Sequence, residues 1–131
     1  MIVLDTHSWV WWANGSDELS RAARTRTEAA LREDRLLVSS IRVWEVAMLV
    51  ERGRLRLAIA VDEWVGQAER IPGLRFVPVT NAIALRSMQL PGRFHKDPAD
   101  RIIVATALSH GATVVTRDDR IRGYEHVRTV W

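Results

Sequence analysis

The chain has 131 residues, 47% of them hydrophobic, with a mean hydropathy of −0.09 and a formal net charge of +3 at pH 7. This length supports one domain with its own core, no run approaches the roughly 18 to 20 apolar residues of a membrane span, and the lack of cysteine excludes disulfides and thiolate metal sites. Nearly all of the 19 basic residues are arginine, which fits a nucleic acid or an acidic protein partner and equally an arginine-favouring genome.

Along the chain, short apolar runs alternate with amphipathic segments. In the first half, the pattern predicts a strand at 2–5, a helix at 7–12, a helix at about 17–33 with Ser16 as its N-cap, a strand at 36–38 and a helix at 40–53. The second half predicts a helix at about 61–71, a strand at 76–79, helices at 81–89 and 98–110, and strands at 112–116 and 127–130. The N-terminal residues MIVLD form a short strand-like run without the charged leader or cleavage site of a signal peptide, so we expect a cytoplasmic protein.

This order of elements predicts the fold class. Strands that alternate with helices form an α/β fold whose mostly parallel sheet is covered by helices on both faces. In such sheets, ligands bind beyond the carboxyl ends of the strands. Acidic residues that follow strands are therefore the first candidates for a functional site.

Two aspartates precede the most apolar predicted helix, in the stretch HKDPADRIIVATALSHG from His95 to Gly111. Asp97 is a suitable N-cap, Pro98 suits the first helical position, and Gly111 is a typical helix end. Asp100 would favour the positive end of the helix dipole. Helix capping and the helix dipole are therefore enough to explain both aspartates. Whether either has a second role depends on the other acidic residues of the chain.

Further acids follow two of the predicted strands. Asp5 ends the first strand, and Asp118 follows the strand at 112–116 by two residues, so both are expected at the ligand-binding edge of the sheet. Aspartate is also common in turns and at helix starts, which is the ordinary explanation for each of them. Asp119 is a possible substitute for Asp118, because a slip of one residue in the turn would exchange the two.

Glu45 is harder to explain, because it lies within an apolar helix where an unpaired carboxylate costs several kcal/mol. Its partner is either an arginine, such as Arg42 or Arg101, or a bound cation. Together the four carboxylates would repel one another at neutral pH unless a cation or an arginine neutralised them. Oxygen ligands suit Mg²⁺ or Mn²⁺, and such a site can promote the hydrolysis of phosphodiester bonds.

Four blocks of the sequence resemble one family over essentially the whole chain. They are LDTH at residues 4–7 with the following WVWW, SSIRVWEVA around Glu45, HKDPADRIIVATAL around Asp100 and VVTRDDRI around Asp118. In this order and spacing they resemble the PIN domain, and within it the VapC-type toxins of bacterial type II toxin–antitoxin pairs. The resemblance implies a single PIN domain over residues 1–131, folded as a three-layer sandwich with a mostly parallel central sheet between helices.

The resemblance also implies a function and a site. It implies a Mg²⁺-dependent (or Mn²⁺-dependent) ribonuclease whose catalytic and metal-binding quartet is Asp5, Glu45, Asp100 and Asp118, with Asp5 and Asp100 as the most direct metal ligands. Asp97 would then be mainly the N-cap. The hydroxyls of Thr6 and Thr116 match positions beside the quartet and could hold a carboxylate or a metal-bound water. The implied partners are an RNA substrate and a VapB-type antitoxin, in a homodimer or a toxin–antitoxin hetero-oligomer, with no membrane association.

The aromatic and histidine residues admit more than one interpretation. Trp9, Trp11 and Trp12 crowd one short segment and cannot all be fully buried on one narrow helix face. Either at least one of them is an interface residue, or Trp9 and Trp12 belong to the core and Trp11 to the surface; RNA stacking is a third possibility. His7 and His95 are assigned no catalytic role, because a lone histidine beside an acid more often satisfies a hydrogen bond.

Other functions remain open at this stage. A PIN-like module that binds RNA or protein without catalysis would keep every fold signal, although the intact quartet argues against it. A phosphatase with an aspartyl nucleophile would want a second acid two residues after Asp5, and His7 stands there. A receiver-like signalling domain would need an aspartate after a mid-chain strand, where LLVSS and FVPVT have none.

Overall fold

Five parallel strands form the centre of the molecule, a computed structural model that describes residues 1–131. The strands are β1 (Ile2–Leu4), β2 (Leu36–Ser39), β3 (Leu74–Val77), β4 (Thr113–Val115) and β5 (Thr129–Val130). They lie in the order β3-β2-β1-β4-β5, and every neighbouring pair is parallel. The predicted parallel sheet is confirmed.

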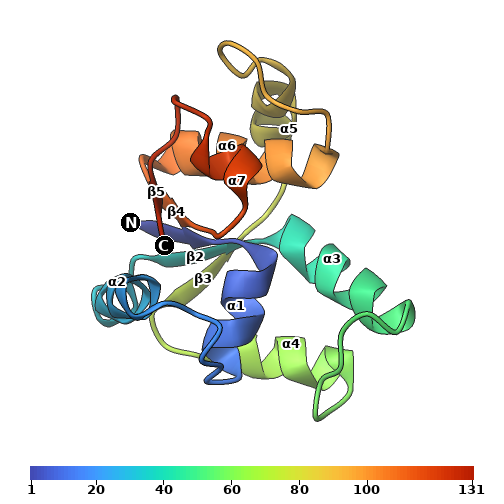
Figure 1. Ribbon diagram of the computed structural model, residues 1–131. Helices are drawn as coiled ribbons and strands as arrows, with labels where there is room; N and C mark the ends of the chain where they lie inside the picture. The colour runs from blue at the N-terminus through green and yellow to red at the C-terminus, as the bar shows by residue number, and fades with distance from the viewer.

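Helices cover both faces of this sheet. They are α1 (Thr6–Ala13), α2 (Arg21–Arg32), α3 (Ser40–Glu51), α4 (Val61–Glu69), α5 (Asn81–Met88), α6 (Pro98–His110) and α7 (Asp119–Arg122). Figure 1 shows α5, α6 and α7 on one side of the sheet and α1, α2 and α4 on the other. The predicted three-layer α/β sandwich is therefore confirmed. No helix combines the length and the apolar character needed to cross a bilayer.

Alternate residues of the central strands supply two separate cores. Ile2 and Leu4 of β1 pack in a cluster with Trp9 on one face, whereas Val3 packs on the other face with the apolar side of α6, including Ile103. All five side chains are almost completely buried. Burial on both faces explains why the strands read as continuous apolar runs.

The ends of several elements differ from the predicted ones. Helix α2 begins at Arg21 rather than near residue 17, because the hydroxyl of Ser20 accepts the capping hydrogen bond from Ala23 N at 3.1 Å. Strand β3 ends before Pro78, which has no N–H for the ladder, so it lies two residues earlier than predicted. The four-residue helix α7 was not predicted.

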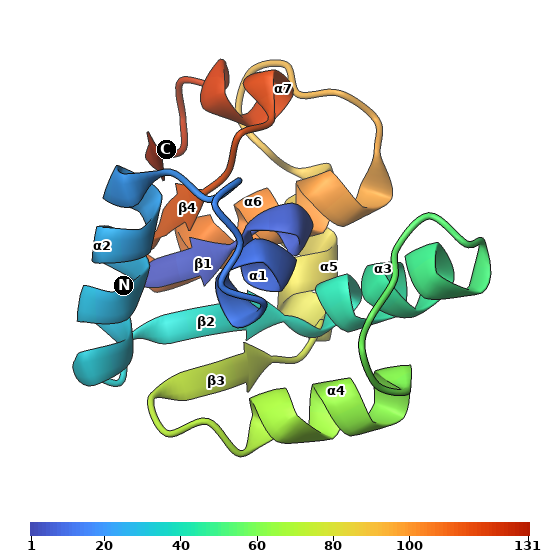
Figure 2. The same ribbon diagram turned by 60° about the horizontal axis from the view of Figure 1, so that its bottom comes forward.

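The chain reverses its direction across the sheet next to β1. From β1 it passes to β2 and β3 on one side, and later to β4 and β5 on the other. Beyond the carboxyl ends of β1 and β4 the two connections therefore diverge, which is where open α/β sheets bind ligands. In Figure 2 the arrowheads of β1 and β2 point toward the beginnings of α1 and α3, at the same edge of the sheet.

Candidate active site

Three predicted site carboxylates meet at this edge around one arginine. The guanidinium of Arg42 forms an ion pair with Asp5, with Nη2 2.9 Å from Asp5 Oδ1, and the same Nη2 donates a hydrogen bond to Asp100 Oδ1 at 3.2 Å. Its Nη1 contacts Glu45 Oε1. The Arg42 side chain is 1% exposed and those of Asp5, Glu45 and Asp100 are 13%, 20% and 11% exposed. The structure thus brings together residues that are far apart in the sequence.

Local structure fixes the two carboxylates that follow β1 and β2. Asp5 is the N-cap of α1 and accepts a hydrogen bond from Thr6 N at 2.8 Å. The hydroxyl of Thr116, just after β4, donates to Asp5 Oδ2 at 2.6 Å, and that of Thr6 donates to Glu45 Oε1 at 3.3 Å. The expectation that these two hydroxyls hold site carboxylates is confirmed by these contacts.

The two aspartates before α6 occupy different environments. Asp97 is exposed and caps the helix, accepting from Asp100 N at 2.9 Å, with Pro98 following it and Gly111 ending the helix in the left-handed conformation. Asp100, one turn further on, is buried and turns toward Arg42. The predicted capping role of Asp97 is confirmed, and the structure places Asp100 rather than Asp97 against the cluster.

Asp118 stands at the margin of the cluster and pairs with a second arginine. Arg120 donates to Asp118 from Nη2 at 3.0 Å and from Nε at 3.3 Å, and its Nη2 also lies 3.5 Å from Asp100 Oδ2. Burial opposes the ionisation of Asp118, but the hydrogen bonds and charge of Arg120 outweigh it and lower the pKa of this carboxyl. Asp119 is exposed at the start of α7.

Burial and the charges inside the cluster also shift the pKa values of Asp100 and Arg42. Burial raises the pKa of Asp100, and the positive charge of Arg42 opposes this without cancelling it. Burial would lower the pKa of Arg42, but the three surrounding carboxylates outweigh it and raise that pKa. The arginine is therefore a permanent cation in the cluster.

The carboxylates are suitable metal ligands, but their oxygens do not converge on one ion in this structure. All-oxygen donors suit Mg²⁺ or Mn²⁺, and the Arg42 guanidinium marks a point where Asp5, Glu45 and Asp100 all stabilise a positive charge. No three acidic or histidine side chains converge as ligands of one ion, because the oxygens are directed at the guanidinium instead. The donor set of these residues thus fits a divalent cation, while in this structure it surrounds Arg42.

The arginine partner of Glu45 was left open by the sequence, in which Arg42 and Arg101 were both candidates. In the structure, Arg42 pairs with Glu45, whereas Arg101 donates to backbone carbonyls, among them Ser87 O at 2.7 Å. The spacing of three residues between Arg42 and Glu45, which puts both on one helix face, was the available signal. His95 Nε2 lies 3.1 Å from Asp100 Oδ2 without a well-formed hydrogen bond.

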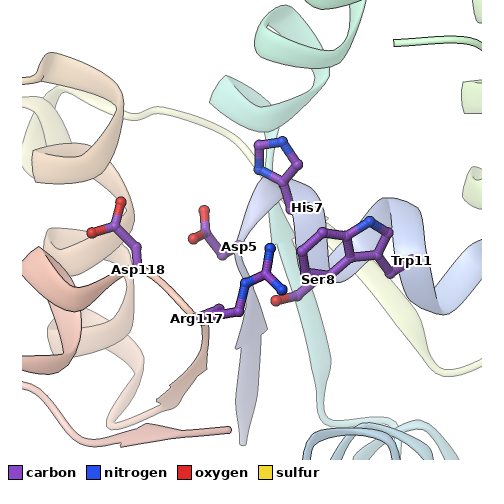
Figure 3. Close-up of a pocket in the computed structure, with 6 residues that line it drawn as sticks. All are labelled: Asp5, His7, Ser8, Trp11, Arg117 and Asp118. Atoms are coloured by element: carbon purple, nitrogen blue, oxygen red, sulfur yellow. The ribbon is translucent and has the colours of Figure 1, made fainter. Parts of the chain in front are cut away.

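A pocket opens beside Asp5 and Asp118 on the outer side of the cluster. Its volume is about 230 Å³, and the remaining lining residues are His7, Ser8, Trp11 and Arg117. The Arg117 guanidinium lies 4.6 Å from the centroid of the Trp11 ring. Figure 3 shows the Arg117 and Trp11 side chains together on the side of Asp5 away from Asp118. The pocket thus combines carboxylates, an aromatic face and a cation.

The tryptophan-rich segment is divided between the core and the surface. Trp9 is fully buried, whereas Trp11 and Trp12 are half-buried. Trp44 on α3, which the sequence did not single out, is the most exposed tryptophan with 57% of its surface accessible. The expectation that the three clustered rings are not all fully buried is confirmed.

The protein is a three-layer α/β domain with four acidic side chains from separate segments gathered at the carboxyl edge of its sheet. The model of the PIN domain family matches residues 2–127, and the chain belongs to this family. It is 42% identical over 133 aligned residues to Ribonuclease VapC22 of Mycobacterium tuberculosis, with 99% of this chain and 98% of the relative covered.

Solved structures share this fold. A toxin–antitoxin complex from Klebsiella pneumoniae superposes with a TM-score of 0.67 at 21% identity, covering 100% of this chain and 97% of that one. VapBC2 from Rickettsia felis, bound to a DNA fragment from its promoter, gives 0.71 at 15% identity, with coverages of 99% and 98%. At these identities the likeness is one of fold.

Proposed function

We propose that the protein is a Mg²⁺-dependent endoribonuclease toxin of a VapBC-type toxin–antitoxin pair. The observation that carries this proposal is the convergence of Asp5, Glu45 and Asp100 on one cationic point, with Asp118 beside it. The 42% identity to a VapC ribonuclease over nearly the whole chain supports the same reaction class. Mn²⁺ is the natural substitute, because it accepts the same oxygen ligands.

Each site residue has a defined task in the proposed hydrolysis. Asp5 and Asp100 would hold the ion most directly, with Glu45 and Asp118 completing the acidic set. When bound, the ion would lower the pKa of a water and stabilise charge on the phosphate oxygens. Thr116 fixes the orientation of Asp5, and Thr6 that of Glu45, through the hydrogen bonds described above.

The pocket beside Asp5 supports a nucleotide chain as the substrate. Stacking on aromatic rings and arginine planes is the usual way in which proteins hold unpaired RNA bases. Trp11 offers such a ring. Arg117, which also forms an exposed ion pair with Glu18 at 3.2 Å, offers a cation for a base or a phosphate. A base held there would place its backbone next to Asp5 and Asp118.

An antitoxin is the proposed regulatory partner. The structural relative from Klebsiella pneumoniae named above is a toxin–antitoxin complex. On this chain, Ile41, Trp44 and Met48 lie on one face of α3 and line a cavity of about 550 Å³ that also borders Glu45 and Asp97. An apolar partner helix packed there would end beside the acidic cluster, where it could exclude RNA.

The decisive test is cleavage of structured RNA by the purified protein with and without a divalent ion. We expect cleavage with Mg²⁺ or Mn²⁺ and none in excess EDTA, followed on denaturing gels, and toxicity on expression that the product of a small neighbouring reading frame relieves. RNA binding without cleavage under every metal condition would favour the alternative, a catalytically inactive PIN-like module.

Replacing Trp11 by leucine should weaken substrate binding with little change in kcat. Loss of stacking with one base costs about 1–3 kcal/mol, so KM should rise about tenfold. The matched control is Trp12→Leu, because Trp12 is also half-buried but lines a separate cavity with Trp64 and Ile71. Steady-state kinetics on a short RNA measures both constants, and equal KM values in the two variants would remove Trp11 from the binding site.

A further inference from the structure

We propose that Arg42 is a built-in competitor for the metal: its guanidinium occupies the cation position of the carboxylate cluster, and a divalent ion binds only by displacing it. This inference rests on the proposed metal dependence of the site. It concerns a residue of the chain itself and predicts how tightly the protein binds a divalent ion before any RNA is present.

The contacts of Arg42 define this competition. Its two terminal nitrogens reach carboxylate oxygens of Asp5, Glu45 and Asp100, which are three of the four proposed metal-site acids. Arg42 lies on the first turn of α3, and Glu45 follows it by three residues, so the helix itself aims both side chains at the same point. An ion that took the same oxygens as ligands would meet the guanidinium there.

The burial of Arg42 makes its displacement costly. The side chain is 1% exposed, and its Nε has no hydrogen-bond partner, so the carboxylates are the groups that compensate its buried charge. A buried charge that loses its partners is strongly destabilised. An incoming ion must therefore outcompete the guanidinium for the oxygens and also move Arg42 out of its buried position.

Arg120 provides a contrast within the same site. It also pairs with site carboxylates, Asp118 and more distantly Asp100, but its side chain is 59% exposed. Water can replace its contacts, and exposed pairs of this kind are worth little. Arg42 is thus the arginine that limits metal binding, whereas Arg120 can leave without leaving a buried charge unpaired.

The competition has a chemical consequence. A guanidinium neutralises carboxylates but, unlike a metal ion, cannot hold and acidify a water for attack on phosphorus. The form with Arg42 in the cluster is therefore folded and inactive, and the divalent ion concentration decides how much of the protein leaves it. Weak metal binding by the free protein follows.

The test compares Mn²⁺ binding by isothermal titration calorimetry in the wild type, Arg42→Gln, Arg42→Lys and Arg52→Gln. We expect Arg42→Gln to bind Mn²⁺ at least about tenfold more tightly, because a positive charge is removed from among the ligands. Arg42→Lys keeps that charge and should bind as weakly as the wild type. Arg52, exposed at the other end of α3, controls for the change in net charge.

Thermal melting supplies a second readout that needs no RNA. In EDTA, Arg42→Gln should melt below the wild type, since three carboxylates lose their common counter-charge, and Mn²⁺ should raise its Tm more than that of the wild type. Equal Mn²⁺ affinities in the wild type and Arg42→Gln would overturn the inference and leave the proposed function intact. Absence of Mn²⁺ binding in every variant would overturn the metal site itself.

A third measurement decides the question if Arg42→Gln does not fold. The Arg42 Nε–H signal in the NMR spectrum of the wild type, assigned by its absence in Arg42→Lys, should shift as Mg²⁺ is added and the guanidinium leaves the carboxylates. A signal that stays in place at saturating Mg²⁺ would show that Arg42 and the ion are bound together, contrary to the inference.

Discussion

Asp100→Asn is expected to abolish RNA cleavage, whereas Asp97→Asn, three residues earlier, should cleave at close to the wild-type rate. Asp100 is buried and contacts Arg42 within the acidic cluster, and an asparagine amide there supplies less negative charge to a cation. Substitution of outer partners of a metal site typically costs 10–100-fold, so loss of a direct ligand should exceed about a hundredfold. Initial rates at saturating Mg²⁺ measure the difference.

Asp97→Asn is a close control for this experiment. It makes the same chemical change in the same helix turn, and asparagine caps helices about as well as aspartate. Asp97 is exposed and accepts a hydrogen bond from the backbone of Asp100, which the side-chain oxygen of asparagine can also do. Equal losses of activity in the two variants would return Asp97 to the metal site, and melting curves would exclude unfolding as the cause.

Most of the fold could be predicted because burial on both faces leaves a clear trace in the sequence. Strands β1, β2 and β4 are short apolar runs, and α6 has a proline at its start and a glycine after its end. The start of a helix was less predictable where two nearby residues are both suitable N-caps. Ser16 and Ser20 both suit the start of α2, but Ser16 forms a turn with Glu18 N at 3.1 Å and leaves the helix to Ser20.

The acidic residues of the candidate site could be predicted from the sequence, but the arginines that pair with them could not. Acids that follow strands converge because the topology brings the carboxyl ends of parallel strands to one edge. Arginine side chains are long, and many of them are spread along this sequence, so spacing alone does not assign their partners. Arg42 could at least be placed on the face of Glu45, but Arg120 reaches Asp118 only because the chain turns into α7, which is too short to leave a periodic pattern.

Trp9→Ala is expected to lower the free energy of unfolding by about 3–5 kcal/mol, a large part of the roughly 5–15 kcal/mol of a typical domain. Trp9 is fully buried, and its ring packs 4.6 Å from that of Trp64 on α4 and 5.6 Å from that of Phe76 on β3. Its indole N–H has no hydrogen-bond partner, so removing it relieves one unsatisfied donor and keeps the loss within this range. The Tm should fall by about 10–20 °C.

Trp44→Ala is the control for the loss of a tryptophan side chain as such. Trp44 is 57% exposed, so its replacement should change the free energy of unfolding far less than Trp9→Ala does. The consequence of Trp9→Ala should extend to the site, since Trp9 N donates to Asp5 O at 2.9 Å in the first turn of α1, the turn that Asp5 caps. A helix loosened at Trp9 frees Asp5 to turn away from Arg42. Urea unfolding of both variants decides the matter: equal midpoints would mean that α1 is held by contacts other than Trp9.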